Sequence, residues 1–65
     1  MNFCAWLVMQ RKRLMLTQAQ AAERCGVTLK AWQAWEQGVR APVPRSKANI
    51  CRGLQLDPCD PHWRL

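Results

Sequence analysis

The pattern of apolar and polar positions predicts a chain of short helices joined by tight turns. Apolar spacing, helix-forming residues and helix start and stop signals favour helices over residues 3–14, 18–25, 29–37 and 44–55. Beyond these, Asp57-Pro58 and Asp60-Pro61 each have the form of an N-cap followed by proline, which leaves room for one short C-terminal turn or helix. We therefore expect an all-α fold, a compact domain of four to five helices.

The centre of this pattern is a pair of short helices on either side of Gly26. Thr17 and Thr28 each precede a predicted helix and are suited to cap its N-terminus. Gly26 and Gly38 follow the two helices, where a left-handed residue ends a helix and glycine adopts that conformation at low cost. So short a turn makes the two helices cross steeply, which requires apolar or small residues between them. The sequence supplies these at Ala21, Ala22, Cys25, Val27, Trp32 and Trp35.

The second helix of the pair has a polar face opposite its tryptophans. This face carries no acid, and its residues are spaced i, i+3, i+4 and i+7: Lys30, Gln33, Ala34 and Gln37. Lysine donates to guanine O6 or N7, glutamine forms a fork with adenine N6 and N7, and alanine packs on the methyl group of thymine. The face is therefore a candidate reader of base edges, although taken alone it is more typical of a solvated helix surface.

Charge adds a class of partner to this picture. The 65 residues form a single domain, and 10 Lys and Arg residues against 4 Asp and Glu residues give a net charge of +6. Acidic residues are absent from the first 22 positions and again from Gln37 to Leu56, so basic segments flank the helix pair on both sides. This distribution favours a nucleic-acid partner first and an anionic membrane or acidic protein second, while solubility alone also accounts for such a charge.

Catalytic and metal-binding patterns are absent from the sequence. There is one His and no Tyr, and there are no paired carboxylates, phosphate-binding loop or nucleophile motif. Cys4, Cys25 and Cys51 fall within helical patterns, as buried free thiols of cytosolic proteins do. Cys59 and His62 have half the spacing of a zinc site without a second pair, so whether they ever bind metal stays open. We expect no enzyme activity, no cofactor, no metal site and no small-molecule ligand.

The apolar run from Phe3 to Met9 is too short to cross a bilayer. Basic residues follow its seven positions instead of preceding them, and no small-residue cleavage site appears. We therefore expect no membrane segment and a cytoplasmic location.

Spaced residues across the chain resemble the Cro/C1-type family of helix-turn-helix DNA-binding domains, the xenobiotic-response-element or lambda-repressor-like type. They are Leu16-Thr17-Gln18, Ala22, Gly26-Val27-Thr28, Trp32 and Glu36-Gln37-Gly38, within a likeness that covers roughly residues 3–58. The resemblance implies a lambda-repressor-like fold, a double-stranded DNA partner and an ion pair between Arg11 and Glu36, which would otherwise both be solvated. The chain departs from the family at Ala21, where leucine is usual, at Trp32, where isoleucine or valine is usual, and at Leu29, where a polar reader is common.

The expected DNA contacts follow from the helical faces and from this resemblance. The base-reading positions are Lys30, Gln33, Ala34, Leu29 and Gln37. The phosphate contacts are Gln18 and Thr28 at two helix starts, Arg40 in the loop after the second helix of the pair, Arg45 in the next helix, and Arg13. Phosphate contacts set the docking of such a domain, and base contacts set its specificity.

These expectations lead to a sequence-specific transcriptional regulator, a homodimeric repressor that binds an inverted-repeat operator. The run around Trp32 also resembles small phage and mobile-element regulators, including anti-CRISPR-associated repressors. Two other functions stay open on the same fold: a protein-interaction module, antitoxin-like or partner-binding, and an excisionase-like architectural DNA binder. A dimer face is available either on the helix over 3–14, where Trp6, Val8 and Met9 lie off the main apolar stripe, or at Trp63 and Leu65.

Overall fold

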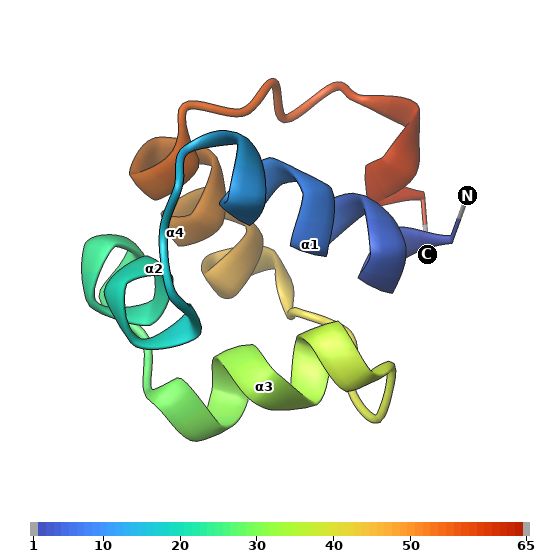
Figure 1. Cartoon of the computed structure of the whole chain (residues 1–65). Helices are drawn as coiled ribbons and strands as arrows, with labels where there is room; N and C mark the ends of the chain where they lie inside the picture. The colour runs from blue at the N-terminus through green and yellow to red at the C-terminus, as the bar shows by residue number, and fades with distance from the viewer. Residues whose placement is uncertain (1, 65) are drawn as a thin grey trace.

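The computed structural model describes residues 2–64, which form a small bundle of helices (Figure 1). In chain order these are α1 (Phe3–Arg13), α2 (Gln18–Cys25), α3 (Leu29–Gln37), α4 (Pro44–Leu54) and the short 3-10 helix η1 (Pro61–Trp63). No strand occurs within residues 2–64, and the predicted all-α class is confirmed. Nor is any helix in this part of the chain long and apolar enough to cross a membrane.

Side-chain caps start α1, α2 and α3, whereas α4 begins at a proline without one. The Thr17 hydroxyl accepts a hydrogen bond from the backbone N–H of Gln20 at 3.1 Å, and the Gln20 side chain accepts one from the backbone N–H of Thr17 at 2.9 Å. Asn2 and Thr28 likewise accept a backbone N–H three residues along and so cap α1 and α3. Such caps satisfy backbone donors that have no acceptor within the helix.

Two of the four α-helices in residues 2–64 end at a glycine. Gly26 and Gly38 adopt left-handed conformations, with φ of 68° and 77°, and end α2 and α3. The predicted boundaries are one residue too long at Leu14 and at Gln55, which are the C-caps of α1 and α4 and not helical residues. Gln55 itself takes the left-handed conformation, with φ of 55°, so α4 ends without a glycine.

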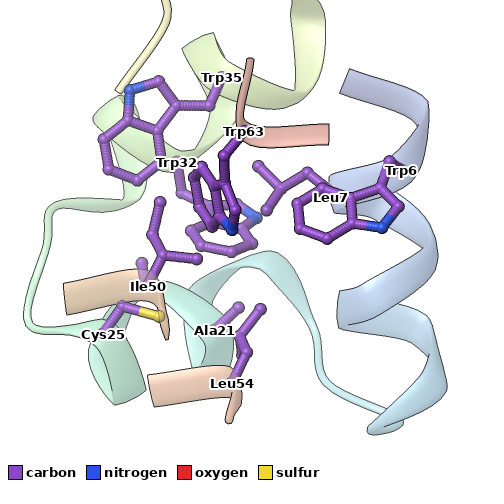
Figure 2. Packing of buried hydrophobic residues seen from close by; sticks show 10 residues of the cluster. Trp6, Leu7, Ala21, Cys25, Trp32, Trp35, Ile50, Leu54 and Trp63 are labelled. Atoms are coloured by element: carbon purple, nitrogen blue, oxygen red, sulfur yellow. The ribbon is translucent and has the colours of Figure 1, made fainter. Parts of the chain in front are cut away.

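One hydrophobic core joins all of these elements. α2 packs against α3 and α4, while α1 packs against α3 and η1. The buried cluster, shown in Figure 2, consists of Trp6, Leu7, Ala21, Ala22, Cys25, Trp32, Trp35, Ile50, Leu54 and Trp63. Ala21 and Trp32, one smaller and one larger than the residue usual in the Cro/C1-type pattern, are both fully buried in it. The two departures therefore lie in the same packed interior, where total volume matters more than the size of either residue.

The C-terminal segment closes the core over α1. In Figure 1 it passes along α1 and brings η1 to the start of that helix. The ring centroid of Trp63 lies 5.3 Å from that of Phe3 and 5.4 Å from that of Trp6, and its indole N–H donates to the backbone oxygen of Asp57 at 3.1 Å. The His62 ring stacks on Trp6 with 4.9 Å between centroids.

This closure corrects the expectation of an apolar surplus on the first helix. Trp6 lies off the stripe that the sequence marks as the core face, yet it is only 5% exposed because η1 covers it. Trp63 is buried as well, so neither indole is free to form a dimer face; Leu65 lies outside the described residues. Among the large apolar side chains of α1, Met9 remains exposed.

Candidate nucleic-acid interface

A shallow depression lies over the outer face of α3 and the loop that follows this helix. Its volume is about 470 Å³, and it is lined by Thr28, Lys30, Ala31, Gln33, Ala34, Gln37, Val39 and Arg40. None of these side chains is acidic. The structure thus brings most of the expected base-reading residues, together with two of the expected phosphate contacts, onto one surface.

Two tryptophans decide which side of α3 faces outward. Trp32 is fully buried, Trp35 is nearly so, and their rings meet edge to face with 5.8 Å between centroids. Because an α-helix turns once every 3.6 residues, burying these two positions places Lys30, Gln33 and Gln37 on the opposite side. Lys30 and Gln37 are exposed, whereas Gln33 is half-buried.

The two ends of α3 add further groups to the depression. The Thr28 hydroxyl accepts the backbone N–H of Ala31 at 3.1 Å, which leaves its own proton available to donate to a phosphate oxygen. Arg40 is exposed at the other end, beyond the left-handed Gly38. Ala31 and Val39 are lining residues that sequence reasoning missed. Val39 is 71% exposed, and the sequence signal that could have placed it on this surface was its position directly after the predicted glycine C-cap, Gly38.

Leu29, Arg45 and Arg13 do not line the depression. Leu29 is exposed at the first position of α3, and Arg45 is exposed in the first turn of α4, directly after the loop. Arg13 lies in the last turn of α1, where its guanidinium donates to the side chain of Gln10 at 3.2 Å. Arg13 is exposed, so its guanidinium stays a candidate phosphate contact.

Behind the depression, Glu36 is the centre of a hydrogen-bond network. Arg11 and Glu36 form the ion pair that the resemblance implies, with Arg11 Nε 2.6 Å from Glu36 Oε2 and Arg11 Nη2 3.2 Å from Glu36 Oε1. Their side chains are only 13% and 5% exposed. Arg11 also donates to the backbone oxygen of Leu16 at 2.8 Å, and the indole N–H of Trp32 donates to Glu36 Oε2. The pair therefore ties α1 to α3 and to the turn before α2.

The same contacts keep the Glu36 carboxyl ionised. Burial by itself raises its pKa, but the hydrogen bonds from Arg11, Gln18 and Trp32, together with the charge of Arg11, outweigh burial and lower the pKa below its ordinary value of 4.5. At neutral pH this group is consequently a carboxylate, which accepts hydrogen bonds and cannot donate one.

Gln18 connects this network to the depression. Its Nε2 donates to Glu36 Oε1 at 2.9 Å, and its Oε1 accepts a longer hydrogen bond from Gln33 Nε2 at 3.4 Å. The side chain that the sequence assigns to a phosphate thus contacts Glu36 and Gln33, and its amide has a second N–H that neither contact uses. Its backbone N–H, at the first position of α2, has no acceptor within the helix and remains suited to an anion.

Neither the cysteines nor the histidine line this surface. Nowhere in residues 2–64 do three or more His, Cys, Asp or Glu side chains gather so that they could hold a metal ion. Cys59 is exposed, and His62 Nδ1 lies 2.7 Å from Asp60 Oδ1. Burial raises the pKa of the Cys25 thiol to about 11, although the charge of Arg24 opposes the rise, so this thiol stays protonated at neutral pH.

Comparison with known proteins agrees with this geometry. Residues 6–63, from within α1 to the end of η1, match the helix-turn-helix domain family. Neither the comparison with curated proteins nor that with solved structures gives a match. The matched range includes α2, the Gly26 turn and α3, which carry the candidate interface. The chain belongs to the helix-turn-helix domain family.

Proposed function

We propose that this chain is a sequence-specific, double-stranded DNA-binding transcriptional regulator that acts without catalysis. The observation that carries the proposal is the acid-free depression over α3, where amide, ammonium and small apolar groups face outward together. These groups match the donors, acceptors and methyl groups that base pairs present in the major groove. The net charge of +6 supports attraction to the phosphate backbone.

In this proposal α3 enters the major groove with its outer face against the bases. Lys30 donates to guanine, Gln33 binds adenine, and Ala34 packs on a thymine methyl group, while Leu29 and Gln37 extend the reading surface at the two ends of the helix. Phosphates are contacted by residues around the rim of this surface: Thr28, Arg40, Arg45 and the start of α2 at Gln18. Arg13, exposed in the last turn of α1, is a further phosphate contact in this proposal.

We further propose that two copies bind an inverted repeat and repress transcription by occupying it. One copy offers a single short reading helix, and a second copy on an adjacent half-site, ~34 Å away along the duplex, doubles the contacts. The resemblance of the run around Trp32 to phage and mobile-element regulators, including anti-CRISPR-associated repressors, supports a regulator of that type.

Selection of duplexes from a random pool by the purified protein tests this function. Recovery of an inverted repeat with half-sites about one helical turn apart supports both sequence reading and a dimer. Gel shifts on random duplex at low and moderate salt accompany the selection. Failure to shift DNA at either salt concentration, with no enriched sequence, refutes the proposal and points to a protein partner. Strong bending without sequence preference points to an architectural role.

Three variants separate base reading from phosphate binding. Gln33→Ala should relax the preference at one base per half-site, because the amide that reads that base is lost. Arg40→Ala should weaken binding to all sequences and reduce the salt slope by about one, because a phosphate contact is lost. Arg52→Ala is the control. It removes the same charge from an exposed residue of α4 that donates to Asn49 at 2.6 Å and does not line the depression. A uniform loss for Gln33→Ala across all sequences removes Gln33 from the reading surface.

A further inference from the structure

A chain of hydrogen bonds runs from the core ion pair to the reading surface. It begins at Arg11, passes through the Glu36 carboxylate to the Gln18 amide, and reaches the Gln33 amide on the outer face of α3. Glu36 is 5% exposed at its side chain, whereas Gln33 lines the depression, so the chain crosses from the interior to the surface. Residues on α1, α2 and α3 all take part.

The acceptor at the buried end decides how both amides are turned. A carboxylate offers no proton, so the group of Gln18 that faces Glu36 has to be the NH₂ group, and this contact measures 2.9 Å. The oxygen of Gln18 is then left for Gln33, whose NH₂ group must in turn be the one that points inward, at 3.4 Å. The nitrogen and oxygen of a side-chain amide have similar shapes, so the orientation of each amide follows from which of its partners can donate and which can only accept.

The turned Gln33 amide presents a defined edge to the depression. One of its two N–H groups is used inward by Gln18, which leaves the oxygen and the second N–H for a partner in the depression that Gln33 lines. Adenine offers the complementary pair in the major groove, an N6 donor beside the N7 acceptor. Guanine offers two acceptors, O6 and N7, of which O6 opposes the Gln33 oxygen.

We propose that Gln18 is a positioning residue that holds the Gln33 amide in this orientation and thereby makes the domain select adenine over guanine at one base pair per half-site. Gln18 sets this preference without touching the base. The inference rests on the proposed function, since it assigns the origin of specificity to a residue behind the reading helix. It assigns to the buried Glu36 carboxylate a part in specificity in addition to its part in the fold.

The test is a two-by-two set of proteins: wild type, Gln18→Met, Gln33→Ala and the double variant. Methionine keeps the length of the Gln18 side chain and removes its donor and acceptor. Selection with wild type and Gln33→Ala identifies the base position that Gln33 reads. The affinities of all four proteins are then measured on two duplexes that differ only by adenine or guanine there, and thermal melting of each protein shows that it is folded. Gln18→Ala is made as a second variant in case methionine disturbs packing.

We expect wild type to favour the adenine duplex by ~10-fold or more, as a fork between glutamine and adenine does. In Gln18→Met that ratio should fall several-fold, because the Gln33 amide is free to turn its NH₂ group to guanine. In the Gln33→Ala background, Gln18→Met should leave the ratio unchanged.

Three other results overturn the inference, and they can be told apart. If Gln18→Met weakens both duplexes equally, with and without Gln33, then Gln18 acts only through phosphate and does not orient Gln33. If wild type shows no sequence preference at any position, the proposed function itself fails, and the inference fails with it. A preference for guanine at the Gln33 position refutes the orientation alone.

Discussion

Replacing Arg11 by methionine removes the cation that pairs with Glu36 while keeping a side chain of similar length. The two side chains are 13% and 5% exposed and are joined by two hydrogen bonds, at 2.6 Å and 3.2 Å. Without Arg11 the Glu36 carboxylate stays buried with donors only from Gln18 and Trp32. Breaking a buried ion pair in this way costs ~3–5 kcal/mol, and the two remaining donors place the expected loss at the lower end, ~3 kcal/mol.

That loss is large for a domain of this size. A chain of 65 residues has a total stability of roughly 3–10 kcal/mol. For domains of this length each 1 kcal/mol lowers the melting temperature by about 4–8 °C, so Arg11→Met should melt roughly 12–24 °C below wild type. Arg40→Met is the matched control: it removes the same charge from an exposed loop residue and should melt at the wild-type temperature within error.

The assay is urea unfolding followed by tryptophan fluorescence and circular dichroism, for wild type, Arg11→Met, Glu36→Gln and the double variant. Because the two side chains contact each other, the double variant should lose less than the sum of the single losses, with a coupling of ~2 kcal/mol. A coupling energy below ~0.5 kcal/mol between the two substitutions is typical of independent sites. It would refute the interpretation that the Arg11–Glu36 pair stabilises the fold.

A pH series provides a second reading of the same network. The pKa of Glu36 is lowered in the folded protein, so the unfolded chain binds a proton at this group more readily than the folded chain does. The contribution of Glu36 to stability is therefore fully present at neutral pH and is lost as the pH falls below 4.5 towards the folded-state value. Glu36→Gln should flatten this acid-side loss, and an equally steep loss in the variant would contradict the assignment.

Other substitutions test local features of the fold. Gly26→Ala and Gly38→Ala both place a side chain on a left-handed residue, at a cost of ~1–2 kcal/mol. Gly38→Ala should cost more in urea unfolding, because its added carbon would lie 2.9 Å from Cys4 Sγ whereas nothing lies within 4 Å at Gly26; equal losses would contradict the close contact. Cys59 is exposed and should react with a thiol reagent at mildly alkaline pH, whereas the buried Cys25, with a pKa of about 11, should react only on unfolding. Equal reaction rates of the two thiols in the native protein would show that Cys25 is accessible.

The helices and their limits were determined by the sequence alone, because the signals that set them act over a few residues. The cap of Thr17 reaches the N–H of Gln20, and Gly26 and Gly38 end their helices through their own backbone conformations. The outward polar face of α3 was equally predictable, since burying Trp32 and Trp35 leaves one side of a helix for solvent or DNA. The two boundaries that were wrong by one residue lie where no glycine marks the end of the helix.

The partners of side chains that meet across the fold were decided only by the tertiary structure. Gln18 and Glu36 are 18 positions apart in the chain, and the sequence indicated a phosphate for Gln18 because a helix start attracts anions. Packing of α2 against α3 brings its amide to the Glu36 carboxylate, a contact that the sequence did not indicate. In the same way Trp6 departs from the apolar stripe of its helix, and η1 covers it only because the C-terminal segment returns across α1. Periodicity describes one helix at a time, whereas the surface that covers a residue belongs to another element, whose position depends on the packing of the whole chain.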